Sequence, residues 1–241
     1  MKRIVAERIV RNPEKYAHHD RVFLNNPVVM QGMGLAPLVV LATTGKNALM
    51  LAVAVALLLT PSRLLACLLS RAFPLRDEEP AQEELESKLL ARGLVYAGSA
   101  AVVYLAVYPI LNALFGVDLL SLGIYLPMLV VEPLLIYRFG RVQETAKKAF
   151  SKGIRITVGY VLLLLLLGCA REWLAMGTVF GLPLSRPVLP MANMPAGGFI
   201  VLGILCAVWR ALAQKRKQYL KTEAENLVSV HRQKEANREH E

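Results

Sequence analysis

The chain has 241 residues, of which 55% are hydrophobic and 19% are charged, and its formal net charge is +10. The charged residues gather in a few segments between long apolar runs, which is the pattern of an integral membrane protein. The net charge gives no reason to predict nucleic-acid binding, so we expect no nucleic-acid partner.

Residues 1–24 are predicted to form a cytoplasmic N-terminal arm. At helical spacing its apolar and charged residues fall on opposite faces, and Asn12-Pro13 ends the pattern. The apolar face holds Met1, Val5, Ala6, Ile9 and Val10, and the charged face holds Arg3, Glu7, Arg8 and Arg11. This pattern is typical of a helix on the membrane surface, and a solvated arm is the alternative. A signal peptide is not expected, because no apolar core follows the charged start directly.

Six apolar runs have about the length that spans a bilayer, roughly twenty residues. They cover residues 26–44, 47–69, 93–115, 119–137, 154–174 and 194–213. We therefore predict an all-α membrane domain at 25–213 with six transmembrane helices. An acidic cytoplasmic loop is expected at 70–92 and a charged cytoplasmic tail at 214–241.

The basic residues set the predicted orientation. Of the 28 Lys and Arg residues, all except Lys46, Arg171 and Arg186 lie in the N-terminal arm, the second-to-third connection, the fourth-to-fifth connection or the tail, including their flanks. Basic residues are retained on the cytoplasmic side of short loops. Both termini are therefore predicted to be cytoplasmic, and the number of spans is even. The basic start of the tail is expected to bind anionic lipid.

Two apolar segments contain matching interruptions, Gly34-Leu35-Ala36-Pro37-Leu38-Val39-Val40 and Ile124-Tyr125-Leu126-Pro127-Met128-Leu129-Val130. Proline disrupts a helix, and a broken helix persists in the membrane only against protein or a water-filled cavity. On the predicted topology the first and fourth spans run in opposite directions, which indicates two inverted three-helix repeats. Gly34, Pro37 and Pro127 are therefore candidates for an ion path or subunit interface. Coincidence is the alternative, since Gly and Pro are common in membrane helices.

Glu132 is the only acid deep in a predicted span apart from those at the span ends, and it directly precedes Pro133. Intramembrane acids are costly and usually face protein or water. One hypothesis makes Glu132 a protonatable group that lines an ion or proton path between the half-helices. The alternative is a carboxylate that is solvated near the cytoplasmic end of the span.

Several chemistries are not expected from these residues. Cys67, Cys169 and Cys206 form no C-x-x-C pair, so a thiolate metal site from this chain alone is not predicted. All four histidines lie outside the spans, which excludes a haem ligand pair within the bilayer. The segment Thr44-Gly45-Lys46-Asn47 lacks the first glycine of a phosphate loop, and nucleotide binding is rejected. The adjacent Arg171 and Glu172 cannot face each other on a helix, so each is expected to bind a separate partner, a helix end or a neighbouring subunit.

Several motifs together resemble the membrane subunits of the Rnf and Nqr electron-transport complexes, especially the RnfE/NqrD branch, which is related to RnfA/NqrE. They are Asn25-Asn26-Pro27, Gln31, Gly34-Leu35-Ala36-Pro37, Asn47-Ala48-Leu49, Leu122-Gly123-Ile124-Tyr125-Leu126-Pro127, Arg171-Glu172, Gly177-Thr178-Val179-Phe180 and Met194-Pro195-Ala196-Gly197-Gly198-Phe199. The resemblance extends over nearly the whole chain. It implies a multi-pass protein of the bacterial cytoplasmic (inner) membrane, built from two inverted halves. It also implies a sister subunit of opposite topology inside a complex that passes electrons from NADH or ferredoxin while moving Na⁺ or H⁺.

The family also implies an iron–sulfur centre, held by two cysteines from each sister subunit, one in each broken helix. In this sequence the two ligand positions fall at Ala36 and Pro133, and neither side chain can bind iron. We therefore expect no catalytic residue, metal ligand or cofactor site on this chain, and no flavin site. The favoured interpretation is a structural or ion-path subunit of an ion-translocating oxidoreductase. The alternative is a stand-alone relative that acts as a small transporter or as a non-enzymatic membrane partner.

Overall fold

A computed structural model describes residues 20, 22–32, 34–72, 82–129 and 146–239 of the protein. Its long helices are α5 (Gly45–Ala72), α6 (Gln82–Phe115), α9 (Ala146–Met176) and α10 (Pro195–Glu239). The shorter helices are α3 (Pro27–Gln31), α4 (Leu35–Leu41), η1 (Gly116–Leu122), α7 (Tyr125–Met128) and η2 (Pro190–Asn193). Strands β1 (Thr178–Val179) and β2 (Leu182–Pro183) pair in an antiparallel hairpin between α9 and η2.

Within the described residues, four helices are long and apolar enough to cross a membrane. Their membrane-length parts are Gly45–Leu69, Gly93–Leu122, Phe150–Met176 and Pro195–Val230. They correspond to the second, third, fifth and sixth predicted spans. The prediction of an all-α membrane protein is therefore confirmed.

The other two predicted spans differ from these four. The first, 26–44, consists of the two short helices α3 and α4, so the predicted discontinuity is present. The fourth, 119–137, begins as η1 and α7, and its residues from 130 onward lie outside the described part of the chain.

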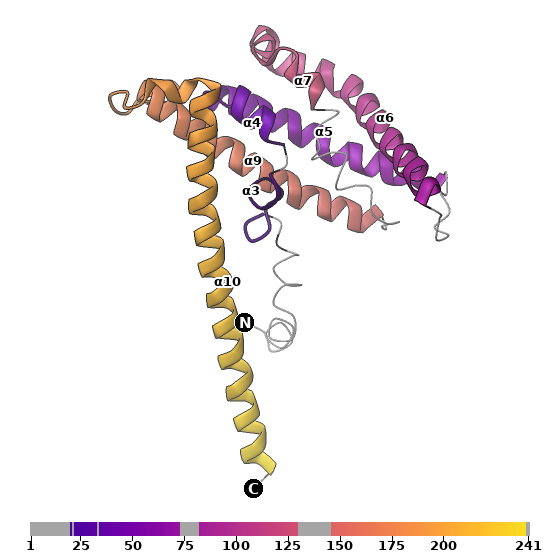
Figure 1. The fold of residues 1–241 in the computed structure, drawn as a ribbon, viewed down its shortest axis with the longest axis vertical. Helices are drawn as coiled ribbons and strands as arrows, with labels where there is room; N and C mark the ends of the chain where they lie inside the picture. Colours follow the sequence, from indigo (N-terminus) through magenta and orange to yellow (C-terminus); the bar gives the residue numbers. More distant parts are fainter. Residues whose placement is uncertain (1–19, 21, 33, 73–81, 130–145, 240–241) are drawn as a thin grey trace.

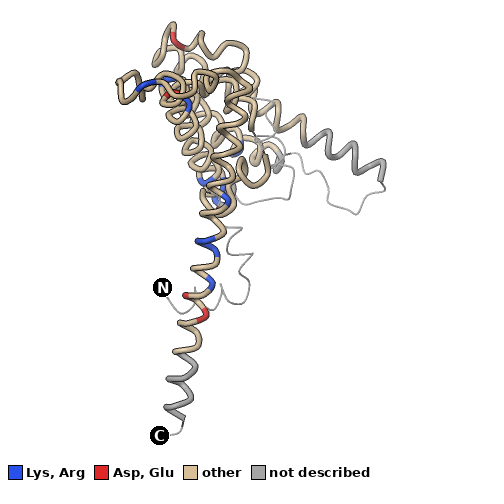
Figure 2. The backbone as a smooth tube through the Cα atoms, turned by 60° about the vertical axis from the view of Figure 1, so that its left-hand side comes forward, with Lys and Arg blue, Asp and Glu red and all other residues tan. Residues whose placement is uncertain are grey.

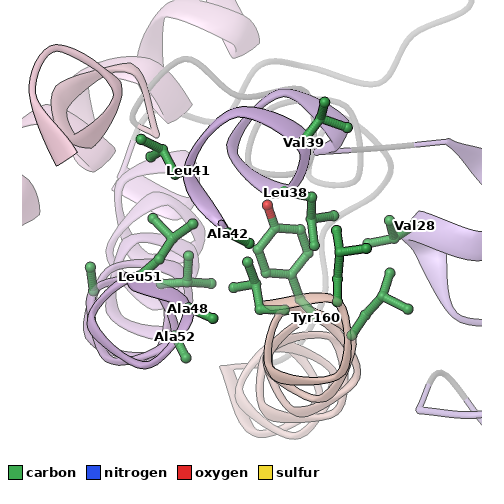
Figure 3. Close-up of a cluster of buried hydrophobic side chains, with 14 of the residues drawn as sticks. Val28, Leu38, Val39, Leu41, Ala42, Ala48, Leu51, Ala52 and Tyr160 are labelled. Carbon is green, nitrogen blue, oxygen red and sulfur yellow. The ribbon is translucent and has the colours of Figure 1, made fainter. Parts of the chain in front are cut away.

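Helix α5 lies between α6 and α9, and the three helices form the upper body of the molecule (Figure 1). The core fills the space between α4, α5 and α9, where the ring of Tyr160 reaches from α9 toward Leu38 and Ala42 of α4 (Figure 3). Small residues of α5, such as Ala48 and Ala52, face this cluster. Without a hydrophobic driving force between helices in lipid, small residues favour association because they allow close packing.

All four long helices extend beyond their predicted spans, α6 and α10 by the most. Helix α6 begins at Gln82, inside the segment expected as a loop, because 82–92 is rich in Gln, Glu, Lys, Leu and Ala, which favour helices. Helix α10 includes the predicted tail and continues to Glu239, far beyond the body (Figure 1). Among the described residues, Lys and Arg lie at both ends of the body and along the extension of α10, whereas the middle of the body is uncharged (Figure 2).

Candidate functional site

The candidate site is the discontinuous segment formed by α3 and α4. The Asn26 side chain caps α3 by accepting from the amides of Val28 and Val29 at 3.0 and 3.4 Å. The chain then passes through Gly32 and Gly34, whose φ angles are 66° and 69°. This left-handed conformation is easily adopted by glycine alone, and the helix therefore breaks here.

The break lies at the glycines and not at the predicted proline. Pro37 is the third residue of α4, within the first helical turn, where its missing N–H breaks no intrahelical hydrogen bond. Pro127 occupies the same place in α7, which follows Gly123 with φ 51°. Both prolines thus mark the beginning of a short helix after a left-handed glycine.

Side chains from α9 and α10 donate to backbone carbonyls on both sides of the break, including one at the C-terminal end of α3, where carbonyls lack intrahelical partners. The Tyr160 hydroxyl donates to the Gly34 carbonyl at 2.9 Å. Arg210 donates twice to the Val29 carbonyl, from Nε at 3.0 Å and Nη2 at 2.7 Å. The break is therefore held against protein, as the sequence predicts for an interrupted membrane helix.

Arg171 of α9 binds the other end of this segment, and it is completely buried. Its Nη1 donates to the carbonyls of Val39 and Ala42, at the C-terminal end of α4, at 2.6 and 3.1 Å. The remaining bonds run to the segment before α10: Nε to Ala192 O at 2.9 Å, and Nη2 to Asn193 O at 3.2 Å and Met194 O at 3.3 Å. One guanidinium therefore joins α4, α9 and η2.

Glu172, the next residue, is also buried and binds different backbone groups. Its Oε2 accepts from the Gly45 amide at 2.6 Å, at the first residue of α5. Its Oε1 accepts from the Gly181 amide at 2.7 Å and from the Thr178 hydroxyl at 2.9 Å, which fixes the β1–β2 hairpin. A carboxylate at a helix N-terminus is favourable because it binds free amides and complements the helix dipole.

The expectation that Arg171 and Glu172 each bind a separate partner is thus confirmed, and both partners include helix ends. We call these two residues the Arg–Glu clamp. Gly198 of α10 permits the clamp to close, because a Cβ there would lie 2.9 Å from the Arg171 Cζ.

The predicted site residues differ in their exposure to the surface. Gly34 and Pro37 are buried, while Ala36 and Pro127 are exposed. Glu132 and Pro133 lie outside the described residues. The Ala36 methyl group does not fit the role of a ligand to an iron–sulfur centre, which needs a thiolate or another donor atom.

No group of three or more His, Cys, Asp or Glu side chains that could hold a metal ion occurs in the described part of the chain. Cys67 is buried, and Cys169 and Cys206 are partly buried. All three lie in the long helices α5, α9 and α10.

Sequence reasoning assigned no role to Tyr160, Arg210 or Asn26. Asn26 also donates to the Gly159 carbonyl of α9 at 2.9 Å, so it joins two segments in addition to capping α3. For Asn26 the sequence does contain a signal, because Asn before Pro at the start of a helix indicates a cap. The long-range bonds of Tyr160 and Arg210 end on backbone carbonyls, which have no sequence signature.

Fold and site together define a multi-pass, mostly helical membrane protein with an interrupted segment held by buried polar side chains. The family model for the Rnf-Nqr subunit, a membrane protein, matches residues 16–206. The chain therefore belongs to the Rnf-Nqr membrane subunit family.

Relatives support this assignment. The E subunit of the ion-translocating oxidoreductase complex of Shewanella sp. strain ANA-3 is 32% identical over 216 residues, which cover 80% of this chain and 85% of the relative. The protein of the same name in Shewanella oneidensis is 31% identical over 215 residues, which cover 80% of this chain and 85% of the relative. The one in Shewanella putrefaciens strain CN-32 is 31% identical over 217 residues, which cover 81% of this chain and 86% of the relative.

Proposed function

We propose that this chain is the E-type membrane subunit of an ion-translocating oxidoreductase complex of the Rnf/Nqr type. In this role it supplies helix packing and part of an ion path, and it contributes no iron–sulfur ligands of its own. The observation that carries the proposal is the similarity to the Shewanella E subunits over 80% of the chain, with alanine at exposed position 36 of the interrupted segment.

The proposed topology has six spans in two inverted three-helix halves, with both termini in the cytoplasm of a bacterial cell and the protein in its inner membrane. One observation supports the repeat: Gly34 and Gly123 both have positive φ, and each leads into a short helix with proline at its third position. The uncharged middle of the body fits a position within the bilayer (Figure 2).

The proposed partners are a sister membrane subunit of opposite topology and the other subunits of the complex. The exposed face of α4 around Ala36 is the proposed contact with the sister subunit, because Ala36 stands at one of the two ligand positions that the family resemblance implies, and the other, Pro133, lies outside the described residues. Anionic lipid is proposed to bind the basic cytoplasmic segments, including the exposed residues Lys215, Arg216 and Lys217 of α10.

Glu132 remains the proposed titratable group of the ion path. An acid at this depth is expected to face protein or water, which fits a path between the half-helices. Glu132→Gln in the assembled complex tests this role: ion transport coupled to electron transfer should fall, and unchanged transport would reject it.

The missing ligand at Ala36 favours one alternative, a stand-alone relative that acts as a small transporter or as a non-enzymatic membrane partner. Purification of the tagged chain from its native membrane separates the two proposals. Stable association with flavin-bearing subunits, and loss of ion-coupled NADH or ferredoxin oxidation when the chain is deleted, support the complex subunit. A chain that purifies without redox partners, and whose deletion leaves that oxidation unchanged, supports the alternative.

A further inference from the structure

The connection between α9 and α10 exposes large apolar side chains. Residues 177–194 contain a single charged residue, Arg186, and the eight residues after it contain none. Val188, Met191 and Met194 each have between 62% and 69% of their surface exposed. Large apolar side chains that lie this close together in the sequence rarely all face water, and they indicate an interaction surface.

This connection does not project into solvent, because its returning part is hydrogen-bonded to the end of α9. The amides of Val188 and Leu189 both donate to the Leu174 carbonyl, at 3.0 and 2.7 Å. The Arg171 guanidinium donates to the carbonyls of residues 192–194. Leu174 and Arg171 belong to the membrane-length part of α9, which ends at Met176. Residues 187–194 therefore lie against the last turns of a membrane span.

The backbone of the connection is paired in the way that a membrane environment requires. The amides of Leu184 and Ser185 both donate to the Gly177 carbonyl at 2.9 Å, and the Met194 amide donates to the Met191 carbonyl at 3.0 Å. An unpaired backbone group is costly in lipid, and irregular backbone persists there only where its polar groups find partners. With these hydrogen bonds the connection can lie at the membrane surface without unfolding.

Lipid is favoured over a protein partner because the apolar surface of the connection continues that of the adjoining spans. Trp173 and Met176 at the end of α9 are 43% and 47% exposed, and Phe199 and Ile200 at the start of α10 are 58% and 63% exposed. Tryptophan is typical of the membrane–water interface, so Trp173 indicates that this level is the interface. Contacts between proteins normally include hydrogen bonds, which the side chains of Val188, Met191 and the spans beside them hardly offer.

We propose that residues 187–194 are an interfacial segment that inserts Val188, Met191 and Met194 into the upper acyl-chain region of a phospholipid bilayer. The segment lies at the end of the molecule opposite to the C-terminus, where α9 leads into α10 (Figure 1). Arg171 binds its backbone and thereby holds the segment against α9. The proposal is independent of the function proposed above, since a subunit of a complex and a stand-alone relative would contain the same segment.

Spin labels measure the position of this segment in the full chain. The three native cysteines are replaced by serine, and Val188→Cys or Met191→Cys is labelled and reconstituted into vesicles of phosphatidylethanolamine and phosphatidylglycerol. The lipid-facing control is Ile204→Cys, on an exposed position of the α10 span, and the water-facing control is Asn226→Cys, exposed on the extension of α10. The unfolding temperature of each labelled variant checks that it remains folded.

The label reports its surroundings through two relaxing agents. Oxygen is apolar and concentrates in lipid, whereas a polar nickel chelate stays in water, so we expect the ratio of oxygen to chelate accessibility at residues 188 and 191 to exceed that at residue 226 by about fivefold or more. A ratio equal to that at residue 226 overturns the proposal, because the segment then faces water. Low accessibility to both agents also overturns it, because protein then covers the segment.

Photocrosslinking tests the segment in the native membrane, where partner proteins are present. A photoreactive phenylalanine analogue replaces Val188 or Met191, and the same analogue at Asn226 is the control. A phospholipid adduct at positions 188 and 191, and none at position 226, supports the proposal. A cross-link from both positions to another polypeptide, including a second copy of this chain, or the absence of a lipid adduct at both positions overturns it.

Discussion

The Arg–Glu clamp predicts a large and specific effect of replacing Arg171 by lysine. Lysine keeps the buried positive charge, but its ammonium has three donors for five carbonyl oxygens that belong to α4 and to the segment before α10. The Met194 carbonyl also accepts from the Gly198 amide at 2.9 Å, so at least one of the other four carbonyls then has no donor. A buried polar group left unpaired costs about 1–3 kcal/mol, and we expect Arg171→Lys to destabilise the protein by at least this amount.

Thermal unfolding of the purified chain in detergent measures this effect, with Trp173 and Trp209 as the fluorescent reporters. For a protein of this size, 1 kcal/mol corresponds to a shift of about 2–4 °C, so a decrease of at least about 2 °C is expected. Arg171→Met removes all five donors and leaves the buried carbonyls in place, so we expect its effect to be larger than that of lysine. The matched control is Arg186→Lys, because Arg186 is exposed.

Hydrogen exchange locates the loss of contact. In Arg171→Lys the amides of 39–44 and 190–194 should exchange faster, and those of α6 should not change, because the guanidinium joins only the first two of these regions. An unfolding temperature equal to that of the unmodified chain, or faster exchange spread evenly over all helices, would refute the clamp.

Three further outcomes follow from the site. Gly34→Ala should lower the unfolding temperature more than Gly116→Ala. Both positions have positive φ, but only at Gly34 would a Cβ contact the Tyr160 ring, at 2.8 Å from Cε2. Equal decreases in the two variants would contradict this. Glu172→Gln should cost about 1–3 kcal/mol and speed amide exchange at 178–181, and unchanged exchange there would argue against the carboxylate contacts. The chain purified alone should show no iron–sulfur absorbance because Ala36 provides no ligand, and stoichiometric iron and sulfide would disprove it.

The sequence predicts the long helices well because their signal is local. A run of about twenty apolar residues is itself the evidence for a span, and α5 and α9 contain their predicted ranges entirely. The interruption of the first span was also predictable from Gly and Pro. The cause of the interruption was not predictable. Pro37 suggests a disrupted helix, but in the structure it lies in the first turn of α4, and the glycines break the helix.

For the contacts of the site, the sequence predicts that buried charges need partners, but it does not predict which groups these partners are. A buried charge in a membrane span needs partners, and the sequence therefore indicates that Arg171 and Glu172 must each find one. The partners themselves are backbone groups: the Arg171 side chain donates to the Val39 carbonyl, 132 positions away. Every residue has a carbonyl and nearly every residue an amide, so neither composition nor periodicity identifies which of them an ionic side chain will bind.

The position of Ala36 explains how a chain can have alanine where the family resemblance implies a cysteine ligand and still have the family's fold. The hydrogen bonds that hold the interrupted segment end on Val29, Gly34, Val39 and Ala42, and they use carbonyl groups that are independent of side-chain identity. Ala36 is exposed on α4, away from these bonds. Exchange of a cysteine for alanine at an exposed position removes a metal ligand without removing a contact within the chain, so the physical requirements for folding and for iron binding are separate at this site.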